Sequence, residues 1–175
     1  MATASALQVA AASAPSEARP ASGEDPPLAI GVRGSAGQSL RRAVLGARRR
    51  LADPSCRQLL TDFSDASGRP LAGALADLGL SPAEYLSFVV FYDGTFKSRC
   101  ASGDVLAGTT PGSRVVWVCA RTFRAAEASD ARLAEALIIH EMLHTLGLGE
   151  NPPTSTEITQ AVLRRCRERP DDDSR

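Results

Sequence analysis

Two histidines one helical turn apart are the residues of this chain best suited to chemistry. His140 and His144 are the only histidines among the 175 residues, and Glu141 lies between them. On an α-helix the Cβ atoms of the two histidines lie roughly 5–6 Å apart, so both rings can bind one metal ion. Glu141 projects about 100° further round the helix, where it borders the same cleft without being a natural ligand. This spacing predicts a zinc site in which Glu141 takes a proton from a metal-bound water as that water attacks a carbonyl.

A pair of buried histidines with a purely structural role is the alternative to a metal site. The helix around the motif is apolar on nearly every side, so the fold should enclose it, and two unliganded histidines would be costly there. Gly147 stands where a residue in the left-handed conformation would end the helix, and Glu150 follows three positions later. These features favour the metal site.

The pattern His-Glu-x-x-His-x-x-Gly-x-x-Glu at residues 140–150 resembles that of the zincin metallopeptidases. The position of its glycine is similar to that in the metzincin branch of the family. In that branch the last position is His, or Asp in snapalysin-type enzymes, and it completes the zinc site. The resemblance implies a Zn²⁺ cofactor, Glu141 as general base, Glu150 as third ligand, and a substrate peptide lying along the edge strand of the sheet. It covers eleven of the 175 residues, and no methionine follows Met142 to form the Met-turn of that branch.

The residues themselves leave two candidates for the third ligand. No third histidine exists, so the ligand must be a carboxylate, a cysteine or a non-protein group, and no cysteine lies close to the motif. Glu157 follows His144 by thirteen residues, which resembles the zincins whose third ligand is a glutamate on a later helix. Its spacing from Thr154 is that of a capping box, however, which already explains it. We therefore predict Glu150, with Glu157 as the alternative.

The four cysteines are dispersed without any C-x-x-C pair, which argues against a structural zinc site and favours two disulfides. Their pairing is left open by the sequence, and four reduced thiols in a cytosolic protein are the alternative. Disulfides indicate an oxidising compartment, so we expect a secreted or periplasmic protein. The cysteines are Cys56, Cys100, Cys119 and Cys166.

Composition divides the chain into one domain and two tails. Residues 1–38 begin with an Ala-rich run and continue rich in Pro, Ser, Gly and Ala, so we expect a disordered segment that is a signal or pro-segment remnant. Residues 39–169 form the expected domain, and residues 170–175 a disordered tail. Twenty basic and twenty acidic residues cancel, and no run of eighteen apolar residues occurs. We therefore expect a monomer that acts on a peptide or protein, with neither nucleic acid nor membrane as partner.

The remaining elements are predicted from apolar periodicity and turn residues. Helices are expected over residues 39–51, 56–63, 71–78 and from Pro82 onwards, then over the motif as far as Leu146 and over residues 154–167. Runs rich in β-branched and aromatic residues predict buried strands at residues 86–92 and 114–119, with a third strand at a sheet edge at residues 106–109. Alternate strand positions fill the packed faces of a sheet, so we expect Phe88, Tyr92 and Trp117 in the core.

Together these patterns predict an α+β, zincin-like fold in which a small mixed sheet packs on helices and the motif helix is buried. The expected activity is zinc-dependent hydrolysis of peptide bonds. Two alternatives remain at this point: a secreted zinc-binding or toxin-like module without turnover, and a zinc amidohydrolase that acts on a non-peptide amide. An open, water-filled coordination position in a cleft would separate the enzymes from the module.

Overall fold

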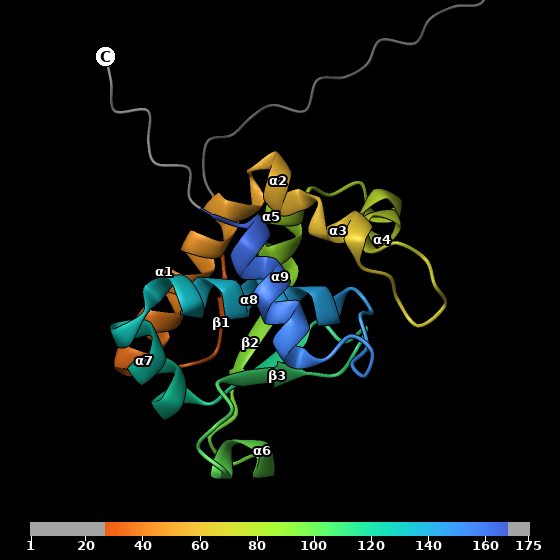
Figure 1. The fold of residues 1–175 in the computed structure, drawn as a ribbon. Coiled ribbons are helices and arrows are strands. Elements are labelled where there is room, and N and C mark those ends of the chain that lie inside the picture. The colour runs from red at the N-terminus through yellow and green to blue at the C-terminus, as the bar shows by residue number, and fades with distance from the viewer. Residues whose placement is uncertain (1–26, 168–175) are drawn as a thin grey trace, which may run out of the picture.

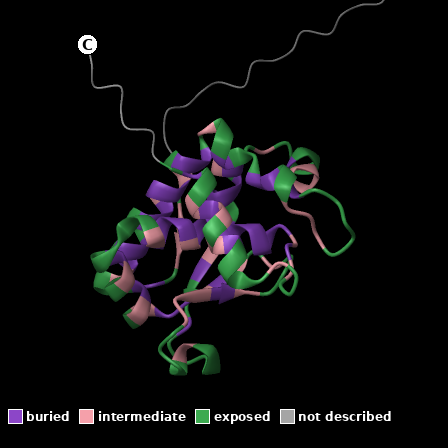
Figure 2. Ribbon diagram, viewed as in Figure 1, coloured by how far each residue is buried: buried purple, intermediate pink, exposed green. Residues whose placement is uncertain are grey.

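Helix α8 (Ala131–Thr145) runs through the middle of the protein and carries both histidines (Figure 1). The computed structural model describes residues 27–167. The helix begins at Asp130, whose side chain accepts a hydrogen bond of 3.0 Å from the backbone N–H of Leu133. Figure 2 shows most of α8 as buried, in agreement with the apolar residues on nearly every side of it. The prediction that the fold encloses the motif helix is confirmed.

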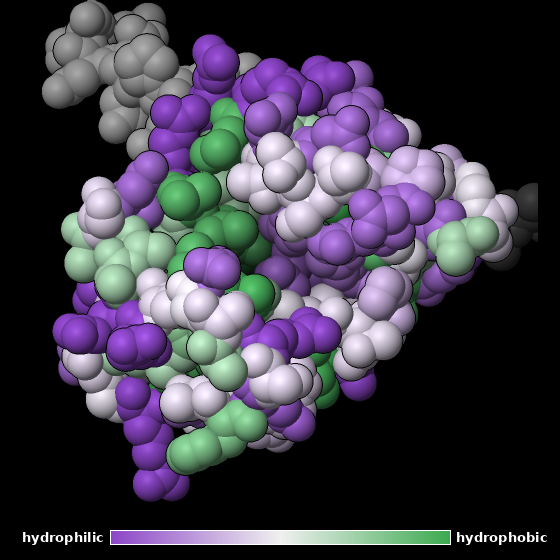
Figure 3. Space-filling model, turned by 60° about the horizontal axis from the view of Figure 1, so that its bottom comes forward, coloured by the Kyte–Doolittle hydropathy of each residue, from purple (hydrophilic) through white to green (hydrophobic). Residues whose placement is uncertain are grey.

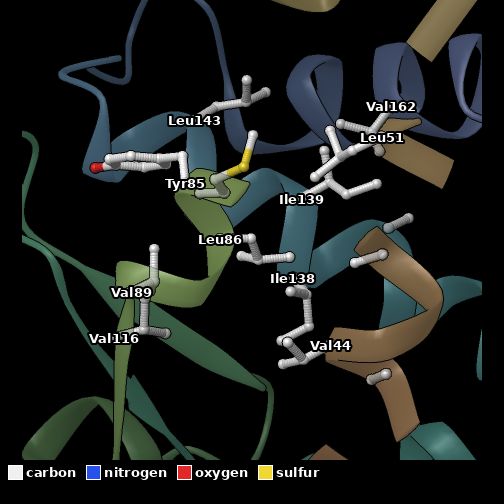
Figure 4. Packing of buried hydrophobic residues seen from close by; sticks show 14 of the residues in the cluster. Val44, Leu51, Tyr85, Leu86, Val89, Val116, Ile138, Ile139, Leu143 and Val162 are labelled. Carbon is white, nitrogen blue, oxygen red and sulfur yellow. The ribbon is translucent and has the colours of Figure 1, made fainter. Parts of the chain in front are cut away.

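Three longer helices pack around α8, namely α1 (Gly34–Leu51), α7 (Ala120–Ser129) and α9 (Ser155–Arg165). Figure 4 shows Ile138 of α8 beside Val44 of α1. It also shows Ile139 of α8 beside Leu51 of α1 and Val162 of α9. All five side chains are buried in one apolar cluster, which fixes the rotation of α8 about its axis and therefore the direction of its histidines.

A four-stranded mixed sheet lies against the helices in the strand order β1-β2-β4-β3. Strands β1, β2 and β4 are parallel, and β3 pairs antiparallel with β4 at the edge. β3 also contacts α8, so the sheet edge runs beside the motif helix. The α+β class, the small mixed sheet and the edge strand are as predicted. The strands are β1 (Ala29–Ile30), β2 (Val90–Asp93), β3 (Ala107–Thr109) and β4 (Val115–Val118).

Short helices connect these elements, and local sequence explains where they start and stop. Helix α4 (Leu71–Leu78) ends at Gly79, which has a φ of +63°. Ser81 and Glu84 form a capping box at the start of α5, and the helix predicted over residues 56–63 is divided into α2 and α3. The short helices are α2 (Pro54–Arg57), α3 (Leu59–Asp62), α5 (Pro82–Tyr85), the 3₁₀ helix η1 (Leu86–Phe88) and α6 (Ser98–Ala101).

Two predictions for residues 86–120 are wrong. The predicted strand at residues 86–92 begins only at Val90, because the chain continues from α5 into η1. Phe88 and Tyr92 are exposed and Trp117 is half-buried, since they do not join the cluster that packs against α8. Figure 3 turns the lower side of the molecule towards the viewer and shows apolar (green) patches among hydrophilic (purple) ones. Aromatic residues in the runs predicted as strands were thus poor indicators of burial.

The start of the domain and the segment before α8 also differ from expectation. Residues 29–38 were predicted as part of a disordered segment but form β1 and the first turn of α1, and residues 1–26 and 168–175 lie outside the described residues. Helix α7 was not predicted. Glu127 belongs to α7, and its carboxylate accepts hydrogen bonds of 2.7 and 2.8 Å from Arg42.

All four cysteines form disulfides, as predicted, with Cys56 bonded to Cys166 and Cys100 bonded to Cys119. The first joins α2 to the end of α9, and the second joins α6 to the end of β4. Chain-entropy estimates for loops of these lengths are about 5 and about 3 kcal/mol. Disulfides are compatible with the expected extracytoplasmic location. Across residues 27–167, no helix combines the length and apolar character needed to cross a membrane.

Candidate metal centre

Three side chains that could hold a metal ion meet near the end of α8. The Nε2 atoms of His140 and His144 are 3.0 Å apart. The Oε1 of Glu150 lies 3.2 Å from the Nε2 of His144 and 3.8 Å from that of His140. One ligand atom from each of the three residues lies within 4.8 Å of the others. Two imidazole nitrogens and a carboxylate oxygen suit a divalent transition metal, so the donor set fits the predicted ion.

The turn after α8 decides which nitrogen of His144 faces this group. Gly147 has a φ of +109°, and the next residue, Leu148, brings its carbonyl oxygen to 2.7 Å from the Nδ1 of His144. A carbonyl can only accept a hydrogen bond, so Nδ1 must carry the proton and donate it. The lone pair of the neutral ring is therefore on Nε2, the atom that points at Glu150 and His140. Glycine is required for this turn because of its positive φ.

A hydroxyl group from another helix holds His140. The Oγ1 of Thr159, on α9, lies 2.9 Å from the Nδ1 of His140. A hydroxyl can accept a hydrogen bond from the N–H at Nδ1, which would leave the Nε2 lone pair of His140 free for a metal as well. Burial, and to a lesser degree the neighbouring His144, lowers the pKa of His140 from 6.5 to about 4. His140 is therefore neutral at physiological pH, the state that a metal ligand requires.

Glu141 is buried beside the ligand group. The residue is 6% exposed, and its Oε2 has no hydrogen-bond partner among the described residues. Burial raises the pKa of Glu141 from 4.5 to about 7, with Glu150 adding to the rise, while Arg99 and the backbone N–H of Thr109 oppose it. A cation held by the histidines would lower this pKa and favour the carboxylate. A buried carboxylate oxygen without a partner needs an explanation, and a role in proton transfer offers one.

The structure separates the two candidates for the third ligand. Glu150 lies next to the histidines, as described above. Glu157 instead caps α9: its Oε2 accepts a hydrogen bond of 2.8 Å from the backbone N–H of Thr154, and the Thr154 hydroxyl accepts one from the N–H of Glu157. The capping box explains Glu157 completely, as its spacing predicted, and it has no part in the ligand group.

The ligand group opens into a cleft of about 550 Å³ between α8 and the edge strand β3. Residues of β3 form one wall, and the histidines, Glu141 and Glu150 form the other. The loop after β3 is tied to the end of α8 by a hydrogen bond of 2.9 Å from the N–H of Gly112 to the carbonyl of His144. The edge strand is thereby held beside the histidines, so a molecule in the cleft would touch both.

Three residues of the centre were not predicted from the sequence. Arg99 lines the cleft, Thr159 contacts His140, and Thr109 acts on Glu141 through its backbone. Each comes from an element far from the motif in sequence, and none belongs to a motif of its own. Of the three, only Thr109 could have been suspected from the sequence, because it belongs to the predicted edge strand at residues 106–109, which was expected to border the substrate.

Comparisons with protein-family models, with curated proteins and with solved structures find no match for this chain. The function is therefore inferred from the chemistry of the cleft. His140, Glu141, His144 and Glu150, all predicted from the sequence, lie together there.

Proposed function

We propose that this protein is a zinc-dependent peptidase of the zincin type, with a metzincin-like site, secreted or periplasmic, that acts on peptides or proteins. One observation carries the proposal: Glu141, a buried carboxyl group whose Oε2 has no hydrogen-bond partner, lines the same cleft as the three candidate ligands. A site that only held zinc for structure would need a fourth protein ligand and would have no use for such a group. Among the described residues, only these three form a group that could hold a metal ion.

In this proposal the side chains have distinct roles. Zinc, when bound, acidifies a water molecule and polarises the carbonyl of the scissile bond. His140, His144 and Glu150 would hold the ion, while the Leu148 carbonyl and the Thr159 hydroxyl orient the two rings. Glu141 would accept the proton of the attacking water through its Oε2 and pass it to the leaving amine.

The edge strand supports a peptide as the substrate. β3 pairs with β4 along one side only, and all three of its residues line the cleft. An extended peptide can add to such an edge through backbone hydrogen bonds, which would lay its carbonyl groups along the cleft towards Glu141. A small non-peptide amide would use the same ligands but would leave this wall unused.

The test combines metal analysis with cleavage of a peptide library by wild-type protein, Glu141→Gln and the control Glu157→Gln. We expect one zinc per chain in all three proteins. Glu141→Gln should lose roughly 10²–10⁴-fold in hydrolysis, the usual effect of removing a general base. Glu157→Gln makes the same change outside the cleft and should cleave like wild type. A chelator should abolish cleavage and added zinc should restore it.

Two outcomes would contradict the proposal. Full activity of Glu141→Gln would exclude this carboxylate as the base. Stoichiometric zinc without cleavage of any peptide would favour the binding module, or an amidohydrolase if non-peptide amides were hydrolysed instead.

A further inference from the structure

The cleft contains one arginine, Arg99, and no lysine among its described lining residues. Arg99 lies on α6, and the residue after it, Cys100, is bonded to Cys119 at the end of β4. This disulfide ties the short helix to the sheet, so the arginine starts from an anchored backbone. The rest of α6 is exposed or half-buried (Figure 2), and Arg99 itself is exposed to solvent. Its contact with the cleft therefore depends on the position of α6.

The guanidinium of Arg99 lies against the middle of the edge strand. A Cβ atom added at Gly108 would be 2.2 Å from the Nη1 of Arg99 and 3.3 Å from its Cζ. Any larger residue at position 108 would thus displace the guanidinium. The neighbouring Thr109 interacts through its backbone N–H with Glu141. Arg99 is therefore next to the part of β3 where an extended substrate would pass the general base.

Arg99 is close enough to Glu141 to lower the pKa of that carboxyl, but its guanidinium makes no direct bond to it and is available to an anion. The carboxylates that line the cleft are those of Glu141 and Glu150, and both would repel a substrate carboxylate. Arg99 is therefore the lining residue that could attract one. Within residues 27–167, no hydrogen bond or ion pair joins the guanidinium of Arg99 to another residue, in contrast to Arg42 and Arg69, which bind acidic partners. A guanidinium presents several N–H donors in a planar array that matches a carboxylate.

We propose that Arg99 is a specificity-determining residue that binds a carboxylate of the substrate, so that the preferred peptides carry one near the scissile bond. The carboxylate belongs either to an Asp or Glu side chain or to the C-terminus of the peptide. This inference rests on the proposed peptidase function. A charge-assisted hydrogen bond of this kind corresponds to about a 10- to 100-fold preference for the acid over its neutral amide.

The experiment uses zinc-loaded, full-length protein and quenched fluorescent peptides in which a single Glu, or a single Gln, occupies each position in turn. Each peptide is made with a free and with an amidated C-terminus, which separates the two sources of the carboxylate. The measured quantity is the ratio of kcat/KM for the acid and amide members of a pair. Arg99→Gln is compared with Arg121→Gln, which alters an exposed arginine on α7 outside the cleft.

We expect wild type and Arg121→Gln to prefer the acid by at least tenfold at one position, Arg99→Gln to show a ratio near one, and Arg99→Lys to recover part of the preference. Arg99→Glu should favour Lys over Gln at that position. Because the ratio compares two peptides on one protein, a loss of folding or of general activity cancels. A ratio near one in wild type, or one that Arg99→Gln leaves unchanged, would overturn the inference; the latter would mean that Arg99 acts on every substrate alike.

A binding measurement separates this inference from the proposed function. Zinc-loaded Glu141→Gln, with and without Arg99→Gln, is titrated with the same acid and amide peptides by calorimetry. Carboxylate-dependent binding that disappears with Arg99→Gln supports the role of Arg99 even if no peptide is cleaved. Equal affinity for acid and amide peptides would reject it while leaving peptide hydrolysis by wild type unaffected.

Discussion

Replacing Glu141 by Gln should alter the pH dependence of the stability of the metal-free protein. Burial raises the pKa of Glu141 to about 7 in the folded state, against 4.5 for an ordinary glutamate. The folded state thus binds this proton more tightly, so the resulting stability is fully present below pH 4.5 and is lost as the pH rises through about 7. One pKa unit corresponds to about 1.36 kcal/mol of stability. Most of the loss falls between pH 5 and pH 8, where stability should decrease by about 2.5 kcal/mol. Glutamine does not titrate, so the variant should lack this loss.

The assay is urea unfolding of chelator-treated protein with intact disulfides, at pH 5 and pH 8, followed by the fluorescence of Trp117. All other titrating groups are shared by wild type and variant, so the change in their stability difference isolates Glu141. Hydrogen bonds from Thr154 lower the pKa of Glu157, so both pH values lie above its titration. The control Glu157→Gln should therefore change stability equally at both. An equal effect of Glu141→Gln at pH 5 and pH 8 would refute the buried, proton-binding carboxyl.

Two further predictions concern the ligands and their support. Glu150→Gln should weaken zinc binding by more than about 100-fold in competition with a chromogenic chelator. Loss of a metal ligand should reduce affinity more than loss of a residue that only hydrogen-bonds to a ligand. Wild-type affinity in that variant would remove Glu150 from the ligand set. Thr159→Val keeps the shape but not the hydroxyl that contacts His140, and should weaken zinc binding by about 10- to 100-fold. Thr156→Val, an exposed position on the same helix, is the matched control, and equal affinities for the two variants would exclude an orienting role for Thr159.

Much of the candidate site was predictable because it depends on short-range rules. His140, Glu141 and His144 share one helix, and the position of each follows from the helical period. Gly147 and Glu150 follow directly, so the chain can return the carboxylate to the histidines without help from another element. The end of α4 and the starts of α5 and α9 were also predicted, because the capping residue lies next to the helix in each case.

The features that sequence patterns missed depend on contacts between distant segments. Which strand face is covered is decided by the helices that pack on it, so strand alternation could not show how far Tyr92 and Trp117 are exposed. Phe88 lies in η1, outside the strand that was predicted for it. Thr159 reaches His140 only because α9 packs against α8. Arg99 lines the cleft only because its side chain lies against Gly108 of β3. No local pattern distinguishes them from the other threonines and arginines of the chain.

The two disulfides are attached to these distant segments and not to the motif. Cys166 lies at the end of α9, the helix that carries Thr159, and Cys100 lies beside Arg99 on α6. The ligands themselves occupy eleven consecutive residues and need no covalent support from elsewhere. Reduction would therefore remove the covalent links of the segments that carry Thr159 and Arg99, whereas neither disulfide is attached to α8 or to the turn after it.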